Sequence, residues 1–205
     1  MFDNTSVLPQ QAVIPAIPVQ EIGFDFDGVI ADTAAAFIRL ACSEYGYCSF
    51  TKEDITNFEL ENCLNIPGEV VEKIFTDILT DSLTTGVLPM AGAVECLERF
   101  TLISQVNIIT ARPLHNPVFD WLDRYLSRTA RENIRVVATG DHNDKVRHIH
   151  EHKLKYFIDD RAETCTQLVL ENITPFVFTQ PWNRNRHSLQ MVADWREIRA
   201  LVSEG

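Results

Sequence analysis

The sequence lacks features that would place the protein in several specialised classes. It has no excess of positive charge, because 18 lysines and arginines face 29 aspartates and glutamates, and the formal net charge of −11 argues against a nucleic-acid partner. No apolar run approaches the ~18 residues of a membrane span. The N-terminus shows no basic segment followed by an apolar one, so we expect neither a membrane contact nor a signal peptide. Repeats and low-complexity tracts are also lacking, and 205 residues suffice for one domain with a real core.

Regular cysteine spacing is lacking as well. The cysteines number five, an odd count, and contain no Cys-x-x-Cys pair. Such a set is typical of reduced thiols that mostly fill the core of a cytoplasmic protein. We therefore predict a cytoplasmic protein in which all of the following are reduced: Cys42, Cys48, Cys63, Cys96 and Cys165.

Short apolar runs alternate with helical patterns along most of the chain. We predict strands at about 21–25, 106–109, 134–138, 156–158 and 175–178. Between and after them we predict helices at about 93–100, 117–126, 144–152, 163–170 and 189–202. Strands that alternate with helices indicate an α/β fold, in which helices cover both faces of a parallel sheet.

Two segments depart from this alternation. Residues 33–85 read as helices with no convincing strand, which predicts a small helical insertion after the first strand. Residues 1–20 contain three prolines and predict an extended arm on the surface, since proline disfavours a helix there. The remaining segments, 21–32 and 86–205, would form the core domain.

Two carboxylates follow the first predicted strand at a spacing of two. Because residues two apart in an extended chain share a face, Asp25 and Asp27 should point the same way. Burying two like charges is costly unless a cation or a proton intervenes, and Mg²⁺ is a cation that prefers oxygen ligands. Gly28 then allows a sharp turn and a close approach of the backbone to a ligand. The alternative for these residues alone is a strand end with two solvated acids.

Polar residues also follow the other predicted strands. Thr110 and Ala111 follow the second strand and offer a hydroxyl and a backbone N–H to an anion. Lys145 follows the third strand, and the pair Asp159 and Asp160 follows the fourth. Ligands of parallel sheets bind beyond the carboxyl ends of the strands, so the coincidence predicts one site there. Each residue singly has a plainer explanation, such as a strand-ending threonine, a surface lysine or a capped helix start.

These four stretches, in this order, resemble motifs I to IV of the haloacid dehalogenase (HAD) superfamily. The resemblance implies a Rossmann-like HAD core with a C1-type helical cap formed by residues 33–85. It implies that Asp25 is the nucleophile, which forms an aspartyl-phosphate, and that Asp27 is the general acid and base. Lys145 would offset the charge of Asp25 and of the phosphoryl group, and we place it in motif III ahead of Lys153 and Lys155, which lie too near the fourth strand.

The resemblance also implies the ligands of Mg²⁺ and of the phosphate. The metal would be held by Asp25, the backbone carbonyl of Asp27 and Asp160, with Asp159 holding a metal-bound water. The phosphate would be bound by Gly28, Thr110, Ala111 and Lys145.

Further runs narrow the resemblance to the 5′(3′)-deoxyribonucleotidases and their bacterial relatives over residues 21–195. These runs are Asp25-Phe-Asp-Gly-Val-Ile-Ala-Asp32, Leu-Pro-x-x-Gly-Ala-Val-Glu, Ile-Asp-Asp-Arg161 and Gln-Pro-Trp-Asn-Arg184. The substrate implied is a small phosphomonoester, namely a nucleoside monophosphate, and the protein would be a monomer or a homodimer. The cap lacks the tryptophans that stack the base in eukaryotic members, which leaves Phe37, Phe50, Phe58 and Phe75 as stacking candidates. Trp182 would either shape the rim of the site or anchor its loop.

Four alternatives remain open at this stage. A phosphatase of another metabolite, such as a sugar phosphate, would use the same residues. A phosphomutase would need a basic cap residue, whereas this cap is acidic, and a polynucleotide 3′-phosphatase would need a basic groove. A non-catalytic binding protein would have no need of all the aspartates and the lysine, and all are present.

Overall fold

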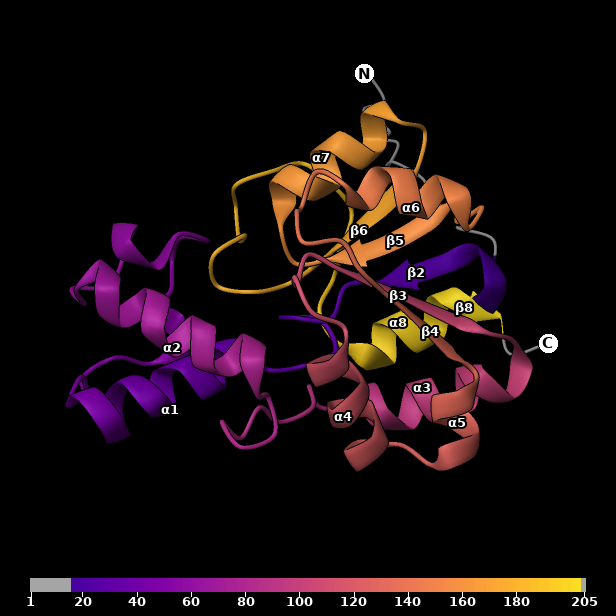
Figure 1. Cartoon of the computed structure of the whole chain (residues 1–205). Helices are drawn as coiled ribbons and strands as arrows, with labels where there is room; N and C mark the ends of the chain where they lie inside the picture. The colour runs from indigo at the N-terminus through magenta and orange to yellow at the C-terminus, as the bar shows by residue number, and fades with distance from the viewer. Residues whose placement is uncertain (1–15, 204–205) are drawn as a thin grey trace, which may run out of the picture.

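Six parallel strands form the central sheet of the computed structural model, which describes residues 16–203 (Figure 1). Their spatial order is β4-β3-β2-β5-β6-β7. The bounds are β2 Ile22–Phe24, β3 Val106–Thr110, β4 Ile134–Ala138, β5 Tyr156–Asp159, β6 Thr174–Phe178 and β7 Met191–Val192. Every neighbouring pair is parallel, as predicted for the five strands expected from the sequence. Short, continuous apolar strands of this kind are buried on both faces.

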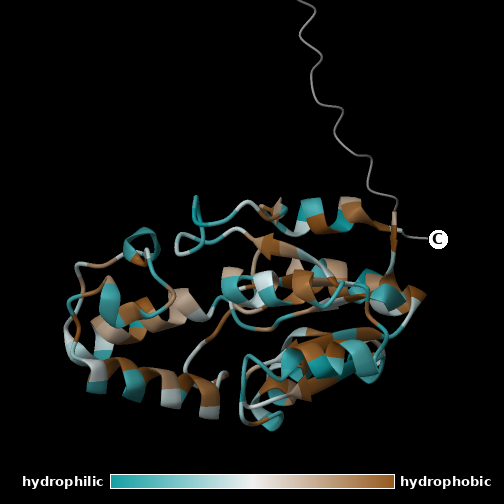
Figure 2. Ribbon diagram, turned by 90° about the horizontal axis from the view of Figure 1, so that it is seen from above, coloured by the Kyte–Doolittle hydropathy of each residue, from teal (hydrophilic) through white to brown (hydrophobic). Residues whose placement is uncertain are grey.

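Helices cover both faces of this sheet (Figure 1). On one side lie α3 (Ala93–Ile103), α4 (Asn116–Tyr125), α5 (Arg128–Glu132) and α8 (Trp195–Leu201). On the other lie α6 (Lys145–Glu151) and α7 (Ala162–Leu170). The buried side chains accordingly form two clusters, and the smaller one joins α6 and α7 to the sheet through Ile149, Phe157 and Leu168. Figure 2 shows the hydrophobic strand segments between the helical layers.

The helical insertion after β2 is confirmed. It contains α1 (Thr33–Tyr45), α2 (Gly68–Thr80) and two short 3-10 turns, Lys52–Asp54 and Leu60–Asn62. Residues 33–85 are all described, and no strand lies among them. The insertion projects to one side of the sheet (Figure 1), and its inward side chains join the larger core cluster. The α/β fold with a helical insertion is therefore the one that the sequence predicts.

The end of the chain differs from the prediction. Instead of one helix over 189–202, the structure has β7, then α8, then a short strand β8 (Val202–Ser203). The reason is Asp194, whose extended backbone and side chain cap α8 by accepting from the N–H groups of Arg196 and Glu197. The residues before this cap are free to extend, and they pair with β6.

The predicted N-terminal arm is described only from residue 16, and its residues 1–15 lie outside the described range. Ile17 and Pro18 are extended, as predicted, but they form a strand, β1, that pairs in parallel with β8. Ile17 is 1% exposed, so this part of the arm is packed into the core and does not lie free on the surface. A 3-10 turn over Val19–Glu21 then leads directly into β2.

The prediction that all cysteines are reduced is wrong for one pair. Cys42 and Cys48 form a disulfide, with their Cα atoms 4.2 Å apart. Helix α1 ends at Gly46, whose φ of 78° turns the chain back beside the last turn of the helix, and this brings Cys48 next to Cys42. The free thiols agree better with the prediction, since Cys96 and Cys165 are buried.

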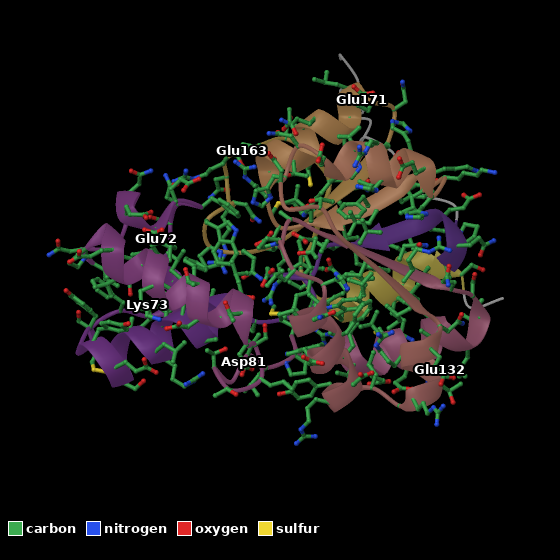
Figure 3. The ribbon with its side chains drawn as sticks, in the orientation of Figure 1. Glu72, Lys73, Asp81, Glu132, Glu163 and Glu171 are labelled. Carbon is green, nitrogen blue, oxygen red and sulfur yellow. A yellow bond between two sulfur atoms is a disulfide. The ribbon has the colours of Figure 1, made fainter. Side chains whose placement is uncertain are left out.

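No helix of the described residues is both long enough and apolar enough to traverse a bilayer. Charged side chains are distributed over the periphery, for example Glu72 and Lys73 on α2, Glu163 on α7 and Glu171 directly after α7 (Figure 3). The acidic character of the sequence is thus spread over several elements.

Candidate active site

The candidate site lies where the order of the sheet reverses. From β2 the chain adds β3 and β4 on one side, and then returns to add β5 and β6 on the other. Such a switch point leaves a crevice beyond the carboxyl ends of the two central strands. Asp25 follows β2, Asp159 ends β5, and Asp160 comes next, so these three of the four predicted acids stand at this crevice.

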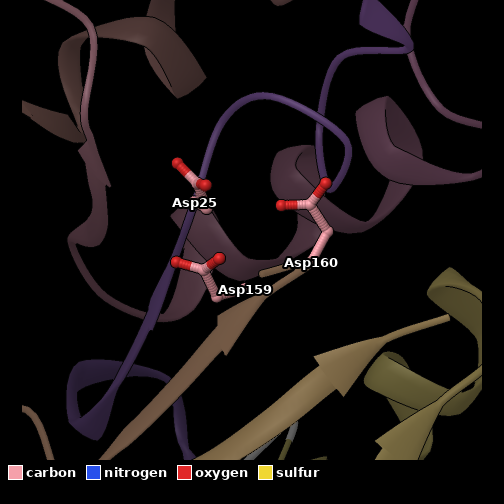
Figure 4. A group of neighbouring side chains, drawn as sticks. All are labelled: Asp25, Asp159 and Asp160. Carbon is pink, nitrogen blue, oxygen red and sulfur yellow. The ribbon is translucent and has the colours of Figure 1, made fainter. Parts of the chain in front are cut away.

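The three carboxylates converge there. One oxygen from each of Asp25, Asp159 and Asp160 lies within 4.8 Å of the others, and all three residues are buried (Figure 4). Lys145, from the first turn of α6, places its ammonium 2.7 Å from both Asp25 and Asp159. If every group is ionised, three negative charges face one positive charge, and two negative charges stay uncompensated.

The protonation of these groups reflects that imbalance. Burial, opposed by Lys145 and helped by the neighbouring carboxylates, raises the pKa of Asp25 to about 7. Burial and the charges of Asp159 and Asp25 likewise raise the pKa of Asp160 well above its ordinary value. For Lys145, burial opposes the charge, but the attraction of Asp159 and Asp25 outweighs it and raises the pKa. The ammonium therefore stays charged, whereas the carboxyls compete for protons.

Gly28 is placed where a side chain would not fit. Its φ is 70°, a left-handed conformation that favours glycine. A Cβ atom at this position would lie 2.7 Å from the Cγ of Asp160, closer than real Cβ atoms approach. The loop is fixed in place because the Gly28 carbonyl accepts a hydrogen bond of 2.6 Å from Gln180. The glycine thus lets the loop after Asp27 pack directly against Asp160.

Asp27 points to a different partner. Arg112 donates from Nε to one carboxylate oxygen of Asp27 at 2.8 Å, and from Nη2 to the other at 2.7 Å. Thr33, the first residue of α1, donates from its hydroxyl to the same carboxylate. Burial opposes the charge of Asp27, but Arg112 and Thr33 prevail and lower the pKa of this carboxyl. The pKa values of Asp25 and Asp27 are therefore shifted in opposite directions, that of Asp25 upward by burial and neighbouring carboxylates and that of Asp27 downward by Arg112 and Thr33.

Arg112 is a residue that the sequence reasoning did not single out. It lies two positions after Thr110, at the end of β3, so the rule that located the other residues also applied to it. A signal was available in the run Thr-Ala-Arg-Pro, but an arginine after a strand is most often a surface charge. Its side chain is instead buried and covers the ring of Phe26, with 4.8 Å from the guanidinium carbon to the ring centroid.

The other predicted phosphate ligands lie at the same crevice. Thr110 is buried, and its hydroxyl accepts from the N–H of Arg112, while Ala111 lines the cavity described below. Of the three candidate lysines, the structure brings Lys145 to the aspartates. Lys155 instead pairs with Glu21 on the surface, and Lys153 stands outside the crevice in a left-handed turn.

A cavity of about 420 Å³ opens from the aspartates toward the insertion. Its floor is formed by Asp25, Asp27, Gly28, Thr110, Ala111 and Asp160. Its other wall comes mainly from α1, α2 and the segment between them, and includes Phe37, Phe58, Phe75, Ile55, Leu60 and Val71. Phe50 is not among the residues that line it. The volume and the largely apolar wall are typical of a small-molecule site with a few polar groups at one end.

Trp182 fits both predicted alternatives, the loop anchor and the residue at the rim of the site. It is buried, as an anchor of its loop would be, and it also lines the cavity. The neighbouring Asn183 holds this loop to the site, because its side-chain amide donates to the carbonyl of Asp160 at 2.8 Å. The loop after β6 therefore supports Asp160 from behind.

Side chains of the insertion meet the core around the cavity. Phe58 packs beneath the guanidinium of Arg161, at 4.9 Å, and edge-on to His142, at 5.7 Å. Glu53 pairs with Arg184 at 2.6 Å. The insertion thus lies over the cavity in this structure, and aromatic and ionic contacts hold it there.

The donor set fits a divalent cation that prefers oxygen. It consists of three buried carboxylates with two uncompensated negative charges, and no histidine or thiol ligand belongs to it. Mg²⁺ and ions like it take such ligands. The carboxylate of Asp27 is turned to Arg112 and is not one of the three, so only the backbone carbonyl of Asp27 stays a predicted ligand.

Comparisons with known proteins agree with this fold. Residues 18–204 match the family model described as "5' nucleotidase, deoxy (Pyrimidine), cytosolic type C protein" (NT5C). Among curated proteins, none matches.

Solved structures are similar to this chain in fold. A haloacid dehalogenase-like hydrolase from Streptococcus pneumoniae is 15% identical, with a TM-score of 0.58, over 87% of this chain and 96% of that chain. A HAD-superfamily hydrolase of subfamily IA from Geobacter sulfurreducens is 18% identical, with a TM-score of 0.54, over 91% and 97%. A family IA HAD hydrolase from Entamoeba histolytica is 12% identical, with a TM-score of 0.51, over 90% and 98%. At these identities, the similarity establishes a shared fold and does not identify a substrate.

Proposed function

Because the chain belongs to the NT5C family of 5′-nucleotidases, within the HAD superfamily of hydrolases, we propose that it removes the phosphate from (deoxy)nucleoside 5′-monophosphates in a Mg²⁺-dependent reaction. The observation that carries the proposal is the buried group of Asp25, Asp159, Asp160 and Lys145, which opens into a cavity large enough for a small organic ester. The family is a cytosolic type of nucleotidase, and we place the activity in the cytoplasm on that ground.

The reaction runs in two steps. A carboxylate oxygen of Asp25 attacks the phosphorus atom, an aspartyl-phosphate forms, and the bond from phosphorus to the ester oxygen breaks. In this step Asp27 must be protonated, against the effect of Arg112 and Thr33, which lower its pKa, and it gives this proton to the leaving alkoxide. The carboxylate of Asp27 then takes a proton from a water molecule, whose oxygen attacks the aspartyl-phosphate and releases inorganic phosphate and Asp25.

Other residues of the chain hold the reacting groups. Lys145 orients the carboxylate of Asp25 and supplies a fixed positive charge beside the phosphoryl group. The hydroxyl of Thr110 and the backbone N–H of Ala111 bind the oxygens of the phosphate. The N–H of Gly28 already donates to the carbonyl of Ala31, so Gly28 contributes by letting the backbone approach the phosphate closely. Bound Mg²⁺, held by Asp25, Asp160 and the backbone carbonyl of Asp27, would neutralise negative charge and favour the ionised form of Asp25.

The insertion serves as the cap, over residues 33–85. Phe58 and Phe75 are half-buried and offer apolar surface to a flat base, and Phe37, which is fully buried, supports Phe75 by stacking on it at 5.2 Å. Three acidic residues, Glu59, Glu61 and Glu72, line the same cavity and disfavour a second phosphate group on the substrate. This charge pattern supports a monophosphate over the bisphosphate that a phosphomutase would need.

Phosphate release from a panel of substrates tests the proposal. The panel contains deoxy- and ribonucleoside 5′-monophosphates, sugar phosphates and an aryl phosphate. Each substrate is assayed once with Mg²⁺ and once with a chelator in its place. Wild-type protein should release phosphate from nucleotides when Mg²⁺ is present and not when the chelator is present, and Asp25→Asn should release none in either condition. Asp120→Asn, on the exposed side of α4, is the matched control and should retain full activity.

Two results would contradict the proposal in different ways. Release from sugar phosphates alone would retain the chemistry and overturn the substrate. Release from nothing in the panel would overturn hydrolysis and support a binding protein with the same fold.

A further inference from the structure

Arg112 makes three hydrogen bonds with its guanidinium group. Two go to the two oxygens of Asp27, at 2.8 and 2.7 Å, and the third runs from Nη1 to the hydroxyl oxygen of Ser82 at 2.6 Å. Arg112 is 2% exposed, and its guanidinium is packed on the ring of Phe26. A guanidinium held from three sides in this way has one orientation, because its planar fork fixes the donors relative to one another.

Ser82 belongs to the segment that leads back from the helical insertion to the core. It follows the end of α2 by two residues, and its hydroxyl donates to the carbonyl of Ile78 inside that helix at 2.9 Å. Because the hydroxyl proton is directed to Ile78, the oxygen is free to accept from Arg112. The hydrogen-bond chain therefore runs from α2 through Ser82 and Arg112 to Asp27.

The other connecting segment reaches the same carboxylate. Thr33 begins α1, where the chain leaves the core for the insertion, and its hydroxyl donates directly to Asp27. Both connections of the insertion thus end on one carboxylate. That carboxylate is 29% exposed and lines the cavity, so it faces the substrate space while Arg112 holds it from behind.

We propose that Arg112 is a positioning residue, which orients the carboxylate of Asp27 toward the leaving oxygen and makes this orientation depend on the place of the insertion, through Ser82. The proposal rests on the proposed function, in which Asp27 transfers the proton. A proton donor must lie within about 2.6–3.2 Å of its acceptor, so a carboxyl group that is rotated away transfers its proton poorly even when it is protonated. When the insertion shifts, Ser82 shifts with α2, and Arg112 loses one of its three fixed contacts.

The test compares two leaving groups. An alkyl phosphate, here a deoxynucleoside 5′-monophosphate, needs a proton on its leaving oxygen. In contrast, 4-nitrophenyl phosphate releases 4-nitrophenolate, a stable anion that needs no proton. Arg112→Gln should lower kcat/KM for the nucleotide about 100-fold and kcat/KM for 4-nitrophenyl phosphate less than about 5-fold. The comparison uses kcat/KM because it reports the step in which the leaving group departs, whereas kcat also includes the later hydrolysis, in which Asp27 serves both substrates alike. Ser82→Ala, which leaves Arg112 and Asp27 in place, should shift the same ratio by about 5-fold.

Arg131→Gln is the matched control. Arg131 also pairs with an aspartate, Asp123, and also covers a phenylalanine ring, Phe119, but it lies on α5 away from the cavity. Arg131→Gln should leave the ratio of the two kcat/KM values unchanged. Arg112→Lys tests the geometry, because an ammonium restores the charge without the fork and should restore the ratio only in part.

Several outcomes overturn the proposal. An equal loss of kcat/KM on both substrates would mean that Arg112 binds the phosphate or supports the site generally, and would overturn the positioning role. If wild-type protein hydrolyses neither substrate, the proposed function fails, and hydrogen exchange of residues 81–88 still tests the coupling. Arg112→Gln and Asp27→Asn should each speed exchange there by more than about 3-fold, and Arg131→Gln should not. Unchanged exchange in both would refute the coupling.

Discussion

Asp160→Asn should stabilise the protein in the absence of a divalent cation, although it should abolish activity. Asp160 is buried within 4.8 Å of two other carboxylates, while Lys145 contacts Asp25 and Asp159. At that distance, and at an effective dielectric constant of about 20, each pair of carboxylates repels by about 3.5 kcal/mol. Partial protonation and the ammonium offset much of this, so we expect a net gain of about 1–3 kcal/mol in the free energy of unfolding. For a chain of this length, the melting temperature would rise by about 2–10 °C.

The gain should depend on pH and on Mg²⁺. The pKa of Asp160 is raised in the folded protein, so its charge costs stability above the folded pKa and costs nothing below the ordinary value of 3.8. The advantage of the variant should therefore disappear near pH 3–4 and be largest above neutral pH. Mg²⁺ at about ten times its dissociation constant should stabilise the wild type by about 1.4 kcal/mol and the variant much less.

Thermal unfolding at pH 7.5 measures this, with EDTA and with Mg²⁺. Asp120→Asn is the control, because it removes a carboxylate from an exposed helix position and should change neither melting temperature nor Mg²⁺ response. If Asp160→Asn melts below the wild type in EDTA at pH 7.5, the charge imbalance inferred for the site is refuted.

Three other perturbations follow from the same structure. Lys145→Met leaves Asp25 and Asp159 without their shared cation, so it should abolish phosphate release and lower the free energy of unfolding by about 3–5 kcal/mol. Urea titration at neutral pH measures this loss, and a smaller loss at neutral pH than at pH 4 would contradict it. Because the pKa of Asp25 is raised from 3.8 to about 7, the stability of the Mg²⁺-free protein should fall as pH rises through that interval, and a melting temperature that rises steadily across it would contradict the assignment. Cys42→Ser removes the disulfide to Cys48 and should lower the free energy of unfolding by about 2 kcal/mol, which corresponds to about 4–8 °C in melting temperature. Equal melting temperatures of the oxidised wild type and the variant would show that the bond is not formed in solution.

The sequence is sufficient to predict the sheet and the acids of the site, because both are local signals. A short apolar run followed by polar residues specifies a buried strand and its carboxyl end, and this places Asp25, Thr110 and Asp160 at one edge without knowledge of distant contacts. The insertion is predictable for the same reason, since helical periodicity changes clearly at Thr33.

The features that the sequence does not predict depend on contacts between distant residues or on the local path of the chain. The pair of Arg112 and Asp27 joins residues from different strands, and nothing in either local segment indicates the partner. The Cys42–Cys48 bond depends on how Gly46 turns the chain, which the spacing alone does not specify. The predicted final helix failed at Asp194, because a helix cap within an apolar pattern divides one periodic segment into a strand and a shorter helix.

The parallel pairing of β1 with β8 has a consequence for how the chain is made. Ile17 pairs with Val202, so this ladder has almost the longest sequence separation that the described residues allow. During synthesis on a ribosome, Ile17 emerges long before its partner strand β8, and its apolar side chain stays exposed until β8 has been made. Biosynthesis should therefore leave this corner for the last step, whereas a chain refolding from denaturant has both strands available from the beginning.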